Sequence, residues 1–268
     1  MITYKAPLRD FRFIYHELFN AEEISAIGEY SEATPELIDA ILEEGAKLCE
    51  NELFPINRSG DEEGCHFDNG DVQTPAGFRT AYDAYVAGSW GSLSCAPEFG
   101  GQGLPNSVNS ALEEMMCSAN LSFSTYPGLT RGVYRALHAF GTQSLQKQYL
   151  PKLVSGKWSG TMCLTEPQCG TDLGLIRTRA ESADNESYRV TGTKIFITAG
   201  EHDLTENIVH LVLARMPNAP AGIKGISLFL VPKFVPDSRN EPSIRNSVTC
   251  ESVEHKMGIK ASATCVMN

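Results

Sequence analysis

One stretch in the second half of the sequence brings together residue types suited to holding a flat ligand. Residues 162–172 read MCLTEPQCGTD, so an apolar strand runs into a proline turn and then a glycine. The end of a strand presents backbone N–H and C=O groups in one plane, which suits the edge of a heteroaromatic ring, and Thr165 and Thr171 add hydroxyls. Gly170 lets a ligand approach the main chain. The alternative interpretation is a tight β-turn with a capping aspartate.

The first 155 residues, which must support this stretch from one side, are predicted to be helical. Thr34-Pro35 places a capping hydroxyl before a proline and predicts a helix that ends near Leu53. Thr74-Pro75 repeats the start signal for a helix that ends at Gly88. Apolar residues at helical spacing predict further helices over 106–116, 133–140 and 142–150.

From Trp158 onward the apolar period falls to two, and Gly and Thr become frequent. These features predict strands over 158–165, 188–191, 194–198, 208–215 and 226–231, with turns at 182–187 and 217–222. The sequence therefore predicts a helical domain followed by an all-β domain, joined near Gly156.

Composition excludes several classes of protein. The 268 residues carry 22 Lys+Arg against 33 Asp+Glu, a net charge of −11, and 42% are hydrophobic. This balance is typical of a folded globular protein, and the negative charge disfavours nucleic acid and acidic membranes as partners. The apolar run at 225–232 is far shorter than the ~20 residues that span a bilayer, and the N-terminus lacks a secretory h-region. We therefore expect a cytoplasmic protein with no membrane partner.

Two polar segments could hold other chemistry. The acidic segment Asn57–Asn69 (NRSGDEEGCHFDN) could ligate a metal, but it lacks the spacings of calcium loops and paired Cys/His sites, so a solvated loop and no metal are expected. Glu201, His202 and Asp203 could form an acid/base site; a polar turn is the favoured interpretation.

Three segments together resemble the acyl-CoA dehydrogenase family of flavoenzymes over nearly the whole chain: 98–103 (EFGGQG), 162–172 and 192–200 (GTKIFITAG). The resemblance implies FAD as the cofactor. It implies that Met162, Leu164 and Thr165 line the pyrimidine edge of the flavin. It also implies that Gly170 and Thr171 lie where the flavin phosphate approaches the substrate, so that Thr171 contacts both ligands.

The resemblance also assigns the segment Phe196, Ile197 and Thr198 to the cofactor. The Phe196 ring is implied to pack on the flavin face, and the Thr198 hydroxyl to bond the nitrogen that receives hydride. Phe stands where many members have Trp, and Cys169 and Leu175 replace smaller residues. A redox disulfide between Cys163 and Cys169 is conceivable near a flavin, but buried free thiols are the favoured interpretation for the eight cysteines.

A narrower resemblance, to the 3-methylmercaptopropionyl-CoA dehydrogenase type, rests on four segments: 6–10 (APLRD), 57–64, 199–207 and 255–259 (HKMGI). It implies an N-terminal extension (1–33). With the change of apolar period and the family resemblance, the chain is expected to have an α+β fold with a helical domain (34–155) and a β-barrel-like middle domain (156–268). The C-terminal helical domain of the family is then absent, and the middle domain is incomplete at its C-terminal end.

The implied reaction is α,β-dehydrogenation of a short-chain acyl-CoA or 3-methylmercaptopropionyl-CoA to the trans-2-enoyl-CoA. Electrons would pass to an electron-transfer flavoprotein, and the enzyme would be a homodimer or homotetramer. The family's glutamate base is expected beyond Asn268, so the catalytic residue is unassigned and the chain alone is expected to be inactive. Alternatives are an acyl-CoA oxidase or related flavin monooxygenase, and an inactive fragment or binding module.

Overall fold

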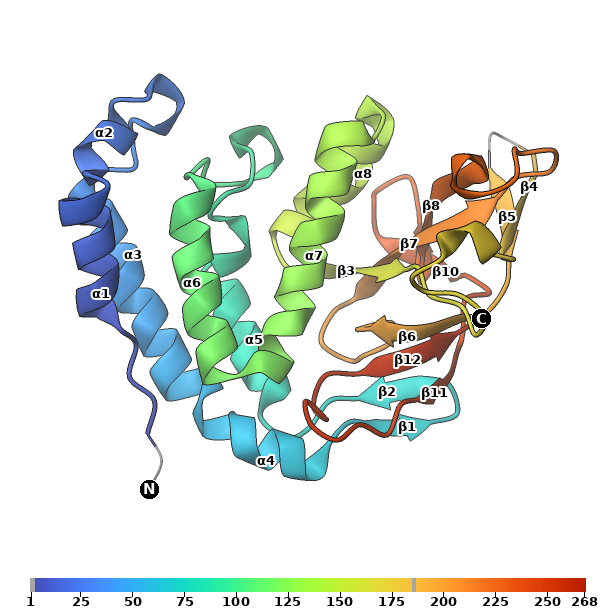
Figure 1. The fold of residues 1–268 in the computed structure, drawn as a ribbon, viewed down its shortest axis with the longest axis horizontal. Helices are drawn as coiled ribbons and strands as arrows, with labels where there is room; N and C mark the ends of the chain where they lie inside the picture. The colour runs from blue at the N-terminus through green and yellow to red at the C-terminus, as the bar shows by residue number, and fades with distance from the viewer. Residues whose placement is uncertain (1–2, 185–186) are drawn as a thin grey trace.

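The structure is a computed structural model that describes residues 3–184 and 187–268, and in it helices precede most of the strands (Figure 1). The helices are α1 Leu8–Arg12, α2 Ala21–Ser25, α3 Pro35–Leu48, α4 Pro55–Glu63, α5 Phe78–Ala87, α6 Asn106–Ala119, α7 Leu121–Phe140 and α8 Gln143–Val154. A π-helical turn over Cys49–Leu53 extends α3, so the predicted helix from Thr34 to Leu53 is confirmed. The Thr34 hydroxyl accepts a hydrogen bond from the Leu37 N–H at 3.3 Å, as the capping signal predicts.

Three predictions about the helical half are wrong. Helix α5 begins at Phe78 behind Gly77, whose φ of +88° favours glycine, and Thr74 instead bonds Asp203. Helix α7 begins twelve residues before Val133, because Asn120 caps it at Phe123 N–H and Pro127 is accommodated inside it. The expected acidic loop over 57–69 consists mainly of helix α4 and strand β1.

The strands are β1 His66–Asp68, β2 Asp71–Gln73, β3 Trp158–Cys163, β4 Arg179–Ser182, β5 Tyr188–Thr191, β6 Lys194–Thr198, β7 Asn207–Arg215, β8 Ile226–Pro232, β9 Phe234–Pro236, β10 Pro242–Arg245, β11 Cys250–Val253 and β12 Thr264–Met267. The five predicted strands are confirmed, although β3 ends two residues early. The predicted turn at 182–187 includes residues 185–186, which lie outside the described residues.

The strands form separate sheets, so the expected β-barrel-like domain is not a closed barrel. The larger sheet centres on β7, which pairs in parallel with β3 and antiparallel with β8. A second sheet has the order β11-β12-β6. Within residues 3–184 and 187–268 no ladder joins β3 to β6, and the two sheets therefore do not close into a barrel.

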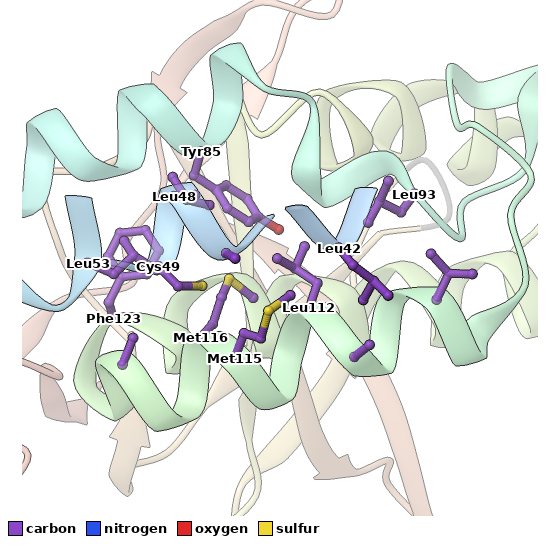
Figure 2. Close-up of a cluster of buried hydrophobic side chains, with 14 of the residues drawn as sticks. Leu42, Leu48, Cys49, Leu53, Tyr85, Leu93, Leu112, Met115, Met116 and Phe123 are labelled. Atoms are coloured by element: carbon purple, nitrogen blue, oxygen red, sulfur yellow. The ribbon is translucent and has the colours of Figure 1, made fainter. Parts of the chain in front are cut away.

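The helical half has its own core between α3, α5, α6 and α7 (Figure 2). Figure 2 shows the apolar side chains that fill it, including Leu42, Cys49, Leu112, Met115 and Phe123. A second core forms where α7 and α8 pack on β3 around the fully buried Trp158. Helix α7 thus joins the helical core to the larger sheet (Figure 1).

The two halves also interlock through a hairpin that the sequence places in the helical half. Strands β1 and β2 lie beside β11 and β12 (Figure 1), and Val72 is buried in the core of the β half. The Cys65 N–H donates to the Lys260 carbonyl at 3.1 Å, and the Lys260 N–H donates to Asp61 Oδ1 at 2.8 Å. Across the described ranges, no helix has both the length and the apolar character needed to cross a membrane.

Candidate functional site

The end of β3 and the strand β6 lie against each other, which brings the two predicted ligand-contacting segments together. The Ile195 N–H donates to the Thr165 carbonyl at 2.9 Å. The Lys194 ammonium donates to the Leu164 carbonyl at 3.0 Å, and the Thr161 hydroxyl donates to the Thr198 carbonyl at 2.5 Å. Residues 162–165 and 196–198 therefore lie side by side, and their accessible atoms form the strand-end surface.

A tight turn brings Gly170 back to the same place. The Glu166 and Cys169 backbones exchange two hydrogen bonds, of 2.8 and 3.0 Å. A Cβ added to Gly170 would lie 3.3 Å from Thr165 Cγ2, so a side chain there would crowd the end of β3. The stretch 162–172 therefore does contain a tight β-turn, and that turn places Gly170 next to the end of β3. The β-turn interpretation and the ligand-contacting interpretation are both compatible with this geometry.

Phe196 is the most unusual residue of the site. Its φ is +58°, in the left-handed region that a bulky residue rarely adopts, and 58% of its surface is exposed. Its neighbour Ile197 is buried, so the backbone turns Phe196 outward while β6 stays anchored. Strain of this kind costs about 1–3 kcal/mol and is found preferentially at functional sites.

The remaining predicted site residues differ in exposure. Met162, Leu164, Thr165, Gly170 and Thr198 are half-buried, and Thr171 is exposed. Among the side-chain hydrogen bonds between described residues, the hydroxyls of Thr165 and Thr198 have no partner, although the Thr198 carbonyl accepts from Thr161. These two hydroxyls are therefore available to a ligand at the strand end.

The carboxylate of Glu166 lies beneath this surface and is almost fully buried. Its Oε1 accepts from the Thr178 N–H (3.1 Å), the Thr178 hydroxyl (2.5 Å) and the Lys194 ammonium (2.9 Å). Its Oε2 accepts from the Arg177 N–H (2.7 Å) and the Gln168 amide (2.6 Å). Burial alone would raise the pKa of Glu166, but these donors, Lys194 first, lower it to about 2.

Glu201 and His202 are buried as well, which argues for a structural role. His202 Nδ1 accepts from the Leu204 N–H at 3.1 Å, so the neutral ring carries its proton on Nε2, 2.9 Å from the Ser159 hydroxyl. Burial, with a smaller contribution from Lys233, lowers the pKa of His202 to about 3. Glu201 binds Lys233 at 2.5 Å, and its pKa is raised because burial outweighs that partner. This geometry favours the polar-turn interpretation over an acid/base site.

All eight cysteines are free, so the Cys163–Cys169 disulfide is absent; six of the thiols are buried, whereas Cys65 is half-buried and Cys117 is exposed. Burial raises the pKa of Cys163 to about 12, which makes it a poor nucleophile. In the described part of the chain, no group of three or more His, Cys, Asp or Glu side chains is placed to hold a metal.

A cavity of about 870 Å³ in the described part of the chain opens between the two sheets. Cys163, Lys194, His210 and Met267 contribute to its lining, whereas Thr165, Phe196 and Thr198 do not. The strained aromatic and the free hydroxyls lie at the strand end, and we therefore place the candidate site there rather than in this cavity.

The sequence reasoning missed the residues that support the site. Glu166 and Lys194 lie inside the two recognised segments, but nothing in the sequence indicates that they pair. Thr161 and Thr178 could not be predicted as supporting residues, because their partners Thr198 and Glu166 lie 37 and 12 positions away along the chain. The only local indications of this support were the glutamate that follows the predicted strand, Glu166, and the lysine at the start of the next predicted strand, Lys194.

Comparison with known proteins decides the family. The sequence model of the acyl-CoA dehydrogenase N-terminal domain matches residues 35–157, and the model of the middle domain matches residues 161–268. The chain belongs to the acyl-CoA dehydrogenase family. The helical and sheet-containing halves are the N-terminal and middle domains of that family.

Individual relatives agree with this assignment. The 3-methylmercaptopropionyl-CoA dehydrogenase of Ruegeria pomeroyi is 47% identical over 99% of this chain and 45% of its own length. A butyryl-CoA dehydrogenase of Syntrophomonas wolfei is 34% identical over 98% of this chain and 44% of its own length. An acyl-CoA dehydrogenase of Bacillus anthracis, solved in complex with FAD, has the same fold, with a TM-score of 0.67, 23% identity, and coverage of 87% of this chain and 35% of that one. The chain spans less than half the length of these relatives.

Proposed function

We propose that this chain forms the FAD-contacting and substrate-contacting part of an acyl-CoA dehydrogenase. The single observation that carries the proposal is Phe196, an exposed aromatic held at positive φ beside the end of β3. Exposing an aromatic ring at a strained position costs free energy, and a flat ligand ring stacked on it would recover part of that cost. FAD in the Bacillus anthracis relative supports this choice of ligand.

The residues present fit the isoalloxazine ring of FAD. Thr165 and Thr198 provide hydroxyls without protein partners among the described residues, and Gly170 leaves the turn open where a Cβ would crowd Thr165. Met162, Leu164 and Thr165 would hold the pyrimidine edge, Phe196 the ring face, and Thr198 the hydride-accepting nitrogen. The side chain of Ile197 is buried in the core of the β half, so Ile197 would take part through its backbone alone. Gly170 and Thr171 would lie near the phosphate, with Thr171 also contacting substrate. Bound FAD supplies the hydride acceptor for the reaction.

The reaction also needs a base to remove the α proton of the thioester, and neither candidate glutamate of the β half suits that role. Glu166 receives five hydrogen bonds and has a pKa of about 2, so it is a very weak base. Glu201 is 2% exposed and paired with Lys233, so its carboxylate is not accessible to a substrate. The catalytic base thus remains unassigned among the described residues.

The substrate is proposed to be a short-chain acyl-CoA or 3-methylmercaptopropionyl-CoA, oxidised to the trans-2-enoyl-CoA. The Ruegeria and Syntrophomonas relatives support this range by their names. We further propose an electron-transfer flavoprotein as the electron acceptor, a homodimeric or homotetrameric assembly, and domain boundaries at 33/34 and 155/156. The cytoplasmic location stays a prediction from the sequence.

Titration of the purified chain with FAD tests the proposal directly. We expect saturable quenching of flavin fluorescence, with weak affinity, and a dissociation constant that rises when Phe196 is replaced by Ala. Phe140→Ala is the control, because Phe140 is 90% exposed on the far end of α7. A titration that never saturates, or that responds equally to both substitutions, would contradict the proposal.

A further inference from the structure

The ion pair of Glu166 and Lys194 is buried directly between the two predicted FAD-contacting segments. Their side chains are 3% and 4% exposed, and Nζ lies 2.9 Å from Oε1. Removing two charges from water is costly, and such a pair often adds less stability than an apolar pair of similar volume. Stability alone therefore does not account for a buried ion pair at this place.

The Lys194 side chain connects strand β6 to the end of β3. Its ammonium donates both to Glu166 and to the Leu164 carbonyl, at 3.0 Å. The next residue, Ile195, donates its N–H to the Thr165 carbonyl. Two consecutive residues of β6 thereby fix two consecutive carbonyls just after β3, and fixing these peptide planes also sets the direction of the adjacent N–H groups.

Glu166 is the anchor of this arrangement and does not depend on Lys194 alone. Its other four donors come from Gln168 inside the turn and from Arg177 and Thr178 after it. Replacing Lys194 by an apolar residue therefore leaves a carboxylate that is still well hydrogen-bonded. The substitution removes the tie to Leu164 and also the counter-charge of Glu166, whose four remaining donors still satisfy the carboxylate.

We propose that Glu166 and Lys194 are a positioning pair that fixes residues 162–165 in register with residues 196–198 before the flavin binds. The inference rests on the proposed FAD site, because it explains how the two halves of that site are held together. The pair acts through Leu164 and Thr165, and it makes no contact with the reacting atoms. Supporting residues of this kind determine how closely the geometry of the empty site matches the geometry needed to bind the ligand.

The test compares Lys194→Met with Lys233→Met. Lys233 also pairs with a buried glutamate of the β half, Glu201, at 2.5 Å, but within the described part of the chain its ammonium makes no hydrogen bond to residues 162–165 or 196–198. For each variant, amide hydrogen exchange at Ile195 is measured without FAD, the FAD dissociation constant is measured by fluorescence, and unfolding is followed in urea. If Lys194→Met does not fold, Lys194→Gln replaces it.

We expect Lys194→Met to speed Ile195 exchange and to raise the FAD dissociation constant by about tenfold, the lower end of the loss seen when partners that orient metal ligands are removed. Lys233→Met should leave the FAD dissociation constant near that of the wild type, and should speed Ile195 exchange by no more than its own loss of global stability explains. Unchanged Ile195 exchange in Lys194→Met, or equal losses of FAD affinity in both variants, would overturn the positioning role. If the wild-type chain binds no FAD, the proposed function fails, and the Ile195 exchange still decides whether the pair fixes the two segments.

Discussion

At the scale of single residues, strain and exposure coincide at Phe196. A residue with a Cβ at positive φ costs free energy, and a glycine does not. The position therefore separates two contributions that are usually mixed, the ring that would contact a ligand and the backbone conformation that presents it.

Replacing Phe196 by Ala and by Gly separates these contributions. Ala removes the ring and keeps the strain, whereas Gly removes both, so we expect Phe196→Gly to be more stable than Phe196→Ala by about 1 kcal/mol. Both variants should bind FAD more weakly than the wild type. Urea unfolding and FAD titration measure the two effects, and a Gly variant less stable than the Ala variant would argue against strain at this position.

His202 predicts a specific dependence of stability on pH. Its pKa is about 3 in the folded chain and near 6.5 when unfolded, so below pH 6.5 the unfolded chain binds the extra proton. Stability is therefore fully present above pH 6.5 and falls as the pH drops toward 3, by about 1.4 kcal/mol per pH unit. Urea unfolding at pH 7.5 and 5.5 should show this loss.

The variant His202→Gln removes the titrating group, so its stability should fall by about 1.4 kcal/mol less than that of the wild type between these pH values. His255→Gln, at an exposed position, should keep the wild-type dependence. Identical pH profiles for the wild type and His202→Gln would show that His202 is not the group responsible.

Residue types and short-range spacing made most of the candidate site predictable. The strand before Glu-Pro, the glycine after it and the aromatic-x-threonine of β6 are all local patterns. The partners of Glu166 were not predictable, because Thr178 and Lys194 reach it through the fold of the β half. The positive φ of Phe196 was also hidden, since the surrounding sequence is typical of a regular strand.

At the scale of elements, the contact between α7 and β3 depends on a residue without a side chain. A Cβ on Gly160 would lie 2.6 Å from the Cβ of Val133, which means that the helix rests directly on the strand backbone. The strand that carries the candidate site at its end is thus held at this contact by the longest helix of the helical half.

Gly160→Ala should force α7 away from β3 and destabilise the chain by about 1–3 kcal/mol, the usual cost of overpacking. Gly132→Ala on the same helix is the matched control, because no atom lies within 4 Å of the added Cβ. That control should be neutral or more stable by up to about 1 kcal/mol, since alanine favours helices over glycine. Thermal unfolding of both variants measures the difference, and equal effects would refute close packing at Gly160.

The errors in predicting elements have a common physical origin. Helix α4 contains Asn57, Ser59 and Gly60, which are poor helix formers, but Gly60 is buried against Phe78 and Ala261 and tertiary packing overrides propensity. Pro127 likewise concealed the first half of α7, although its ring is accommodated in the helix.

At the scale of the whole molecule, the two halves are joined by more than their peptide linkage. The Tyr126 hydroxyl of α7 donates to the Ala261 carbonyl at 2.9 Å and accepts from the Ala263 N–H at 3.0 Å. Both alanines are fully or almost fully buried. One side chain of the helical half therefore satisfies two backbone groups of the β half.

Tyr126→Phe should leave those two backbone groups without a partner and cost about 1–3 kcal/mol for each group that stays dry. Tyr188→Phe, on a half-exposed strand position, serves as the control and should change the free energy of unfolding little. Denaturant unfolding followed separately by near-ultraviolet and far-ultraviolet circular dichroism gives the comparison. A Tyr126→Phe variant as stable as the control would mean that water replaces the hydroxyl.

The order of helices before strands was predictable for the whole molecule, because the apolar period changes near Trp158. The open arrangement of the sheets was not, since it depends on which strand edges meet. The hairpin of β1 and β2 was missed for the same reason: its burial depends on β11 and β12, which are formed almost two hundred residues later.

The bond between Lys260 and Asp61 spans 199 positions of the chain, and this has a consequence for synthesis on the ribosome. The helical half emerges first, with Val72 and the hairpin that carries it still lacking the strands that cover them. Closing so long a loop is slow compared with forming local helices. The nascent helical half is therefore the stage at which this chain is most exposed to aggregation, and the stage at which a chaperone would have the most to bind.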